Sequence, residues 1–160
     1  RAALAAKIER LAVLPLPGSP TAPVAAKVNG VRYALEDNVM GITQMSLSFN
    51  GNQGAWAYTN GQGDNVLPFG IGRVVAGKFP QRNYFGQQIG VIPGVEYACQ
   101  ASAAWVDEQT LNLEVLITDD YLGGLRITFA FKGDEISIFM TKQAEWFLDE
   151  YSGFAGGKRV

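Results

Sequence analysis

The feature that most constrains the fold is a run of four segments in which apolar side chains occupy every second position. The run extends from Val95 to Thr141 and is interrupted by the polar stretches VDEQ, DDYLGG and KGD. Alternation with a period of two places one face of each strand against a core and predicts an antiparallel sheet. The positions expected to face inward are Val95, Tyr97, Cys99, Ala101, Ala103, Leu111, Leu113, Val115, Ile117, Leu125, Ile127, Phe129, Phe131, Ile136, Ile138 and Met140.

The N-terminal half continues this pattern in shorter segments. Asn29–Gly30 separates Val24–Val28 from Val31–Leu35 and predicts a hairpin, because Asn-Gly suits the tight turns of antiparallel strand pairs. The next segment presents an apolar face at alternate positions from 43 to 49, and NGNQG and NGQGD supply the following turns. Pro68 lacks an N–H group, so the strand that contains it is expected at an edge. RVVAGKF indicates one further strand.

The two halves together predict about eight to ten short strands, a number that curls into a barrel or splits into a sandwich. The meander order favours a mainly β fold, an antiparallel up-and-down β-barrel with a short N-terminal helix. Nineteen Gly and seven Pro are available for turns. The aromatic segment QAEWFLDEY is expected to pack on the barrel as a short helix or a last strand. The final GGKRV is expected to be disordered.

The first residues break the strand pattern. Leu4, Ile8 and Leu11 repeat at helical spacing, and Pro15 and Pro17 end the pattern. We therefore expect a helix over residues 2–14 and an extended connector after it. The expected organisation is a junction helix with a Pro-rich linker over residues 1–23 and a single antiparallel β domain over residues 24–160.

Composition excludes several kinds of site. The chain has no His and one Cys, Cys99, so it contains no Ser-His-Asp triad, Cys-His dyad or His-ligated zinc. The net charge of −2 and the lack of a basic run argue against nucleic acid as a partner. No apolar run approaches the roughly 18 residues of a membrane-spanning helix. The calcium-loop pattern is absent as well. We predict no catalytic residue, no metal and no cofactor within these residues.

Short motifs also have plain structural explanations. Tyr58–Asn60 matches the Tyr-x-Asn element of penicillin-recognising hydrolases, but no Ser-x-x-Lys accompanies it, so a turn is the favoured interpretation. Gly70–Gly77 lacks the full spacing of a phosphate loop and is expected to hold a bulge or turn. Most of the paired acidic residues fall in turns. Cys99 is expected to be a buried, unreactive thiol.

Aromatic side chains provide the remaining candidates for a binding site. Small barrels can enclose a ligand, and the rings would then line its cavity. The favoured alternative is that the same rings fill the barrel as an aromatic core, without a ligand. The candidate cavity-lining residues are Trp56, Tyr84, Tyr97, Trp105 and Tyr121.

The phrases LAAKIERLAVLPLP, AAKVNGVRYALEDNVMGITQMSLSF and ASAAWVDEQTLNLEVLITDDYLGGLRITFAFKGDEISI carry a resemblance. Their order resembles the C-terminal β domain of bacterial β-lactamase-like, penicillin-binding-protein-related serine hydrolases. The resemblance implies a lipocalin-like accessory domain without catalytic residues of its own. Such a domain packs on, or modulates, a preceding catalytic domain of the same chain. The whole chain would then be a serine hydrolase, in the bacterial cytoplasm or periplasm.

An alternative of a different class is a stand-alone barrel that binds a small molecule or a lipid. The aromatic set and the loop-like residues 78–93 motivate it. A homo-oligomer is compatible with either function.

Overall fold

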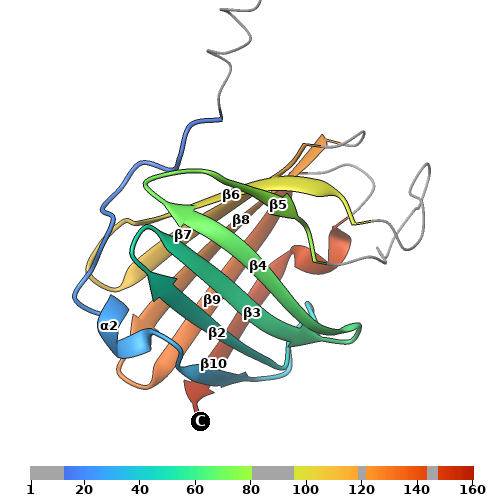
Figure 1. The fold of residues 1–160 in the computed structure, drawn as a ribbon. Helices are drawn as coiled ribbons and strands as arrows, with labels where there is room; N and C mark the ends of the chain where they lie inside the picture. The colour runs from blue at the N-terminus through green and yellow to red at the C-terminus, as the bar shows by residue number, and fades with distance from the viewer. Residues whose placement is uncertain (1–12, 81–95, 119–121, 144–147) are drawn as a thin grey trace, which may run out of the picture.

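The computed structural model describes residues 13–80, 96–118, 122–143 and 148–160. Within them, strands form one sheet in the order β4-β3-β2-β1-β10-β9-β8-β7-β6-β5, and β4 also pairs with β6 (Figure 1). This extra pairing closes nine strands into a ring, and β5 continues along the edge of β6. The predicted antiparallel up-and-down β-barrel is confirmed. The strands are β1 Arg32–Leu35, β2 Gln44–Asn50, β3 Gln53–Asn60, β4 Gly63–Ile71, β5 Val75–Lys78, β6 Ala98–Trp105, β7 Thr110–Thr118, β8 Leu122–Lys132, β9 Glu135–Gln143 and β10 Gly153–Arg159.

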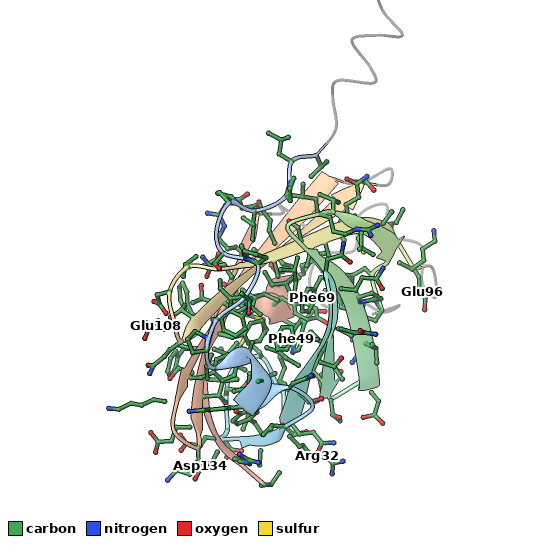
Figure 2. The ribbon with its side chains drawn as sticks, turned by 60° about the vertical axis from the view of Figure 1, so that its left-hand side comes forward. Arg32, Phe49, Phe69, Glu96, Glu108 and Asp134 are labelled. Atoms are coloured by element: carbon green, nitrogen blue, oxygen red, sulfur yellow. The ribbon has the colours of Figure 1, made fainter. Side chains whose placement is uncertain are left out.

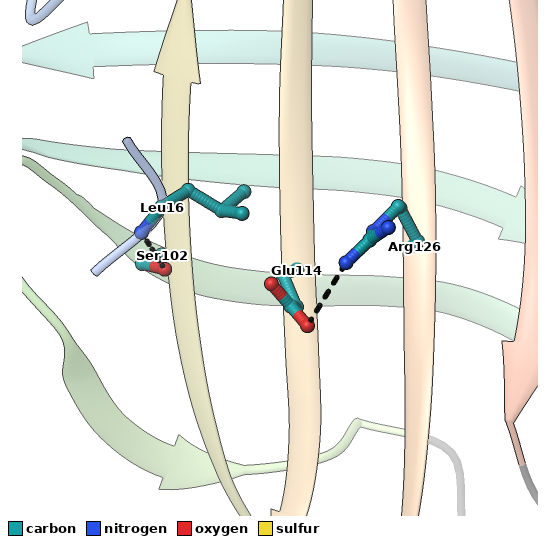
Figure 3. Close-up of polar contacts among 4 residues, drawn as sticks. All are labelled: Leu16, Ser102, Glu114 and Arg126. Atoms are coloured by element: carbon teal, nitrogen blue, oxygen red, sulfur yellow. Dashed lines mark hydrogen bonds and ion pairs between the residues drawn. The ribbon is translucent and has the colours of Figure 1, made fainter. Parts of the chain in front are cut away.

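The core lies where the alternation places it. All the positions predicted to face inward are buried, apart from Val95, which lies outside the described residues. Of the positions from 43 to 49 expected to face inward, Met45 and Leu47 are buried, Phe49 is half-buried, and Thr43, which precedes β2, is exposed. The outer face of the sheet carries polar pairs such as Glu114 and Arg126, whose charged groups lie 3.5 Å apart on β7 and β8 (Figure 3).

The hairpin predicted at Asn29–Gly30 is wrong. Ala25–Val28 forms a short helix, α2, in place of a strand. The Asn29 side chain then pairs with β2, because its amide nitrogen donates to the Phe49 carbonyl (3.2 Å) and its oxygen accepts from the Phe49 N–H (2.9 Å). The Gly30 N–H donates to the carbonyl of Leu47, at 2.7 Å. Asn-Gly thus joins the end of α2 to β2, and no hairpin turn forms there.

The prediction that GGKRV is disordered is also wrong. All but Val160 belong to β10, which pairs with β9 on one side and β1 on the other, and the Val160 N–H donates to the Arg32 carbonyl at 3.1 Å. A glycine is required at position 157, because a Cβ there would lie 2.5 Å from Leu35 Cδ2 and 2.6 Å from the Ala34 carbonyl oxygen. The sequence of this segment shows no apolar alternation. Its glycines instead allow the backbones of neighbouring strands to approach closely.

An N-terminal strap, residues 13–22, runs along β6. Ser19 and Trp105 exchange two backbone hydrogen bonds of 2.8 and 2.9 Å, and the Leu16 N–H donates to Ser102 Oγ at 3.1 Å (Figure 3). The strap explains why Ser102 and Ala104, on the outer face of β6, are buried like the inward residues. Of the predicted helix over 2–14, residues 1–12 lie outside the described residues.

The ring closes at a narrow seam between β4 and β6. The two strands run parallel and pair only through Gly70 with Ser102 and Ile71 with Ala103. The backbone nitrogen of Pro68 points away from β3. The Ile71 N–H donates to the Asn52 carbonyl of the β2–β3 turn, and backbone nitrogens alternate in direction along a strand. Because Pro68 is three positions from Ile71, its nitrogen points the opposite way. Pro68 therefore costs β4 no hydrogen bond to β3, although β4 is not a free edge, because its end pairs with β6. Across the described ranges, no helix is long and apolar enough to span a bilayer.

Closure at β10 can be tested with adjacent glycines. We expect Gly157→Ala to destabilise the fold by about 1–3 kcal/mol, because the added methyl group collides with β1. Gly156→Ala is the matched control, since its nearest new neighbour would be the flexible Glu36 carboxylate at 3.6 Å. Urea unfolding of both variants measures the difference. Equal losses would show that the close approach at Gly157 does not matter.

Candidate functional site

A pocket of about 660 Å³ opens at the end of the barrel that α2 covers, and we call it the end pocket. Figure 2 brings this end forward, with α2 across the opening and Glu108 and Asp134 on hairpin turns at its rim. Three separate parts of the chain meet here: α2, the β6–β7 turn and the β8–β9 turn. The lining residues are Pro23, Val24, Lys27, Val28, Tyr33, Glu108, Gln109, Phe131, Gly133, Asp134 and Arg159.

The end pocket combines an apolar floor with a charged rim. Val28, Tyr33 and Phe131 are buried and form the floor. The rim has two cationic and two anionic side chains, all of them exposed: Lys27, Arg159, Glu108 and Asp134. No ion pair joins these four to one another or to other described residues. Such an arrangement suits a molecule with an apolar body and a solvent-facing polar end.

Tyr33 supplies a hydroxyl group next to the charged rim. Burial raises the pKa of Tyr33; the cation of Arg159 opposes the shift and the carboxylate of Asp134 adds to it. The hydroxyl group therefore stays protonated at neutral pH and can both donate and accept a hydrogen bond.

A second pocket of about 320 Å³ lies beside the first, under the N-terminal strap. We call it the strap pocket. Pro23 and Glu108 line both pockets, so the two adjoin. Trp105 lines the strap pocket and also packs into the core.

Two chains of aromatic rings fill much of the barrel interior. Figure 2 labels two rings of the first chain, Phe49 and Phe69, and the centroid separations along this chain are between 5.7 and 6.3 Å. Its rings are Tyr33, Phe131, Trp105, Phe49 and Phe69, in order of contact. The second chain contains Phe129, Trp56, Tyr58, Tyr151 and Phe79.

The second chain holds a buried pair of hydroxyl groups. Tyr58 and Tyr151 approach within 2.7 Å, and either can donate. Burial raises the pKa of Tyr58 well above its ordinary value of 10.0; the hydrogen bond from Tyr151 opposes the shift and the charge of Glu150 adds to it. Tyr58 therefore remains protonated at neutral pH, and its hydroxyl group is already hydrogen-bonded to that of Tyr151.

The predicted cavity-lining residues divide into two groups. Trp56, Tyr97 and Trp105 are buried members of the core, while Tyr84 and Tyr121 lie outside the described residues. The indole nitrogens of Trp56 and Trp105 are buried without a hydrogen-bond partner. Of the three, Trp105 alone lines one of the two pockets at the α2 end.

Sequence reasoning missed the end pocket. Its walls come from α2, which we expected to be a strand, and from two turns that were treated only as connections. Tyr33 carried a usable signal, because it is the single aromatic residue in Val31–Leu35 and a strand there must turn it inward or outward. Without the closure of β1 onto β10, however, nothing in the sequence brings Tyr33 near Phe131.

The short motifs have structural roles, as expected. Asn60 ends β3 and its side-chain oxygen accepts from the Gln62 N–H at 2.9 Å, which is a turn contact. Gly72, at φ 66°, turns the chain between β4 and β5. The Gln109 N–H donates to the Asp107 carboxylate at 2.8 Å and lowers the Asp107 pKa. The parts of the chain that the structure describes hold no metal-ligand cluster.

Comparison with known proteins gives fold neighbours and no family. No family model matches the chain, and no curated protein matches it. It is similar to the fatty-acid-binding protein from Manduca sexta, with 13% identity over 82% of this chain and 98% of that chain, at a TM-score of 0.46. It is also similar to the REP1-NXSQ fatty acid transporter (10%, 84% and 97%, TM-score 0.49) and to human cRBP IV (10%, 81% and 96%, TM-score 0.45).

The resemblance to β-lactamase-like serine hydrolases is therefore wrong. The similar structures are proteins named for fatty-acid binding or transport, or as cRBP IV, and almost the whole of each chain aligns with the barrel. The phrases that suggested a hydrolase domain are those of alternating strands joined by polar turns, which any meander barrel repeats. The function as an accessory domain loses its basis with the resemblance, as does a catalytic domain as its partner.

The buried tyrosine pair should affect stability at high pH. The pKa of the Tyr58 hydroxyl group is higher in the folded state than in the unfolded chain. The protonated group therefore contributes to stability below pH 10, and this contribution is lost as the pH rises above 10. We expect the free energy of unfolding to fall above pH 10, and to fall less steeply in Tyr58→Phe. That variant should also lose about 1 kcal/mol at neutral pH with the hydrogen bond. Urea titrations at several pH values measure both effects; identical slopes would refute the assignment.

Cys99 should be unreactive in the folded protein. Burial raises the pKa of its thiol to about 11, against a smaller lowering effect of Lys78, so the thiolate form is scarce at neutral pH. We expect alkylation by iodoacetamide at pH 8 to be slower than in the urea-unfolded chain by a factor of about 100 or more, as the unfolded thiol titrates near its ordinary value. Similar rates in both states would contradict a buried thiol.

Proposed function

We propose that this chain binds a small apolar or amphipathic molecule, such as a lipid, at the α2 end of the barrel. The observation that carries the proposal is the end pocket, about 660 Å³ in volume, with a floor of Val28, Tyr33 and Phe131. Ligand pockets of small molecules typically have volumes of roughly 300–1,000 Å³ and apolar walls with a few polar groups. The end pocket lies within this range of volume and has an apolar floor beneath a charged rim.

The rim supports an amphipathic ligand. Its exposed charges, among them Lys27 and Asp134, remain in water while the floor is apolar, so a ligand can bury its body and keep a polar end at the surface. All the walls come from one chain, so the proposal requires no second subunit. The ligands named for the similar structures belong to those proteins, and the proposal rests on the pocket.

We also assign Trp105, one of the described aromatic candidates, to this function. Trp105 lines the strap pocket, which adjoins the end pocket, while Trp56 and Tyr97 belong to the core and line neither pocket. The Trp105 ring would form part of the apolar surface that receives the ligand body. Tyr84 and Tyr121 lie outside the described residues.

Val24 offers a direct test, because it lines the end pocket and is only half-buried. We expect wild-type protein to bind the apolar dye Nile red saturably. Val24→Arg should weaken binding by about tenfold or more, since a long charged side chain would occupy the apolar pocket. Fluorescence titration gives the dissociation constants, and circular dichroism verifies the fold.

Val39→Arg is the matched control. This valine is 82% exposed and does not line the end pocket, so the same substitution should leave dye binding unchanged. Absence of saturable binding to the wild type, or an equal loss in both variants, would refute the proposal.

A further inference from the structure

Among the residues that the structure describes, two indole N–H groups inside the barrel have no acceptor. They are the indole nitrogens of Trp56 and Trp105, whose side chains are 0% and 1% exposed. An indole N–H can only donate, so it requires a carbonyl, hydroxyl or ether oxygen as its partner. A buried donor left without one destabilises the folded state, and such groups are uncommon in native proteins.

Trp105 is the donor that lies beside the proposed binding site. It lines the strap pocket, and its ring centroid is 6.2 Å from that of Phe131, which forms part of the floor of the end pocket. Trp56, in contrast, lines neither pocket and stacks on Tyr58 at 3.9 Å. Each of the two tryptophans therefore has an indole nitrogen without a hydrogen-bond partner, but of the two only Trp105 borders the site.

The surroundings of Trp105 favour an uncharged partner. Phe49 and Phe131 flank its ring, and the buried polar or charged residues among those described are Asn65 and Ser102, both neutral. The cations of the site, Lys27 and Arg159, are exposed at the rim. A carboxylate placed beside the indole would lose its hydration without gaining a counter-ion there, which is unfavourable.

We infer that the ligand is an uncharged apolar molecule with a carbonyl-type oxygen, and that this oxygen accepts a hydrogen bond from the Trp105 indole N–H. The inference rests on the proposed function and narrows its ligand class. The hydrocarbon part packs against Phe131 and Phe49, and the oxygen supplies the hydrogen-bond acceptor that the Trp105 indole N–H lacks. Esters, ketones and amides of long-chain hydrocarbons have this chemistry; ionised fatty acids and plain alkanes do not.

Competition with bound Nile red separates these classes. The competitors are methyl dodecanoate, dodecanoate and dodecane at pH 7.5, where the free carboxylate is ionised. We expect methyl dodecanoate to bind about tenfold more tightly than either of the others, the value of one hydrogen bond to a buried donor. In Trp105→Phe this preference for the ester over the alkane should disappear.

Trp56→Phe is the matched control, because it removes the same group from the other aromatic chain. Any cavity that the smaller ring leaves affects ester and alkane alike, so the ratio of their affinities isolates the hydrogen bond. Trp56→Phe should keep the wild-type ratio. A preference for dodecanoate, or an unchanged ratio in Trp105→Phe, would overturn the inference while binding itself, and with it the proposed function, survives. Failure of every compound to bind would refute both.

A measurement on the wild type protects the test against misfolding of the core variants. In nitrogen-15 correlation spectra, methyl dodecanoate should move the Trp105 indole proton downfield, as expected for a new hydrogen bond. Dodecane should produce no such downfield shift. An indole resonance of Trp105 that responds equally to both compounds would overturn the inference even if both variants failed to fold.

Discussion

The pairing of β10 with both β9 and β1 is the constraint on which the rest of the structure depends. A sheet edge that is left unpaired exposes a row of backbone groups, and only full closure removes it. Here β10 lies between β9 and β1, and Gly157 lets it approach β1 closely. The same pairing brings Tyr33 near Phe131, whose ring centroids are 6.0 Å apart. The floor of the end pocket therefore exists because the last strand meets the first.

The strands that could be predicted are those whose burial follows a simple period. From Tyr97 to Met140 each inward position is buried, since each strand has one face on the core. The errors came from contacts between distant parts of the chain. Asn29–Gly30 has the composition of a hairpin turn, yet its hydrogen bonds go to β2. β10 has little apolar pattern, because glycines at close approaches leave none.

For the candidate site, only the kind of side chain inside the barrel could be predicted from the sequence. Aromatic composition correctly suggested rings inside the barrel, and Trp56 and Trp105 are there. The pocket itself depends on how α2 sits against the turns that carry Glu108 and Asp134, and no local pattern encodes that placement. The hydrolase resemblance failed for a related reason: repeated strands and polar turns are shared by barrels of unrelated function, so phrases from them identify an architecture.

The backbone pairing that holds the barrel wall together is shorter at the seam between β4 and β6 than in most of the ring, so the wall opens more easily there. Most of the ring is held by long ladders, while at the seam two residue pairs carry the connection and Pro68 contributes no N–H. Spontaneous fluctuations of a closed barrel concentrate where the fewest backbone bonds must break. Thermal motion would thus part the wall lengthwise beside Gly70 and Ile71, on the edge of β6 that β5 also occupies. A wall built in this way opens first along its side, at the seam, before any of its long ladders separates.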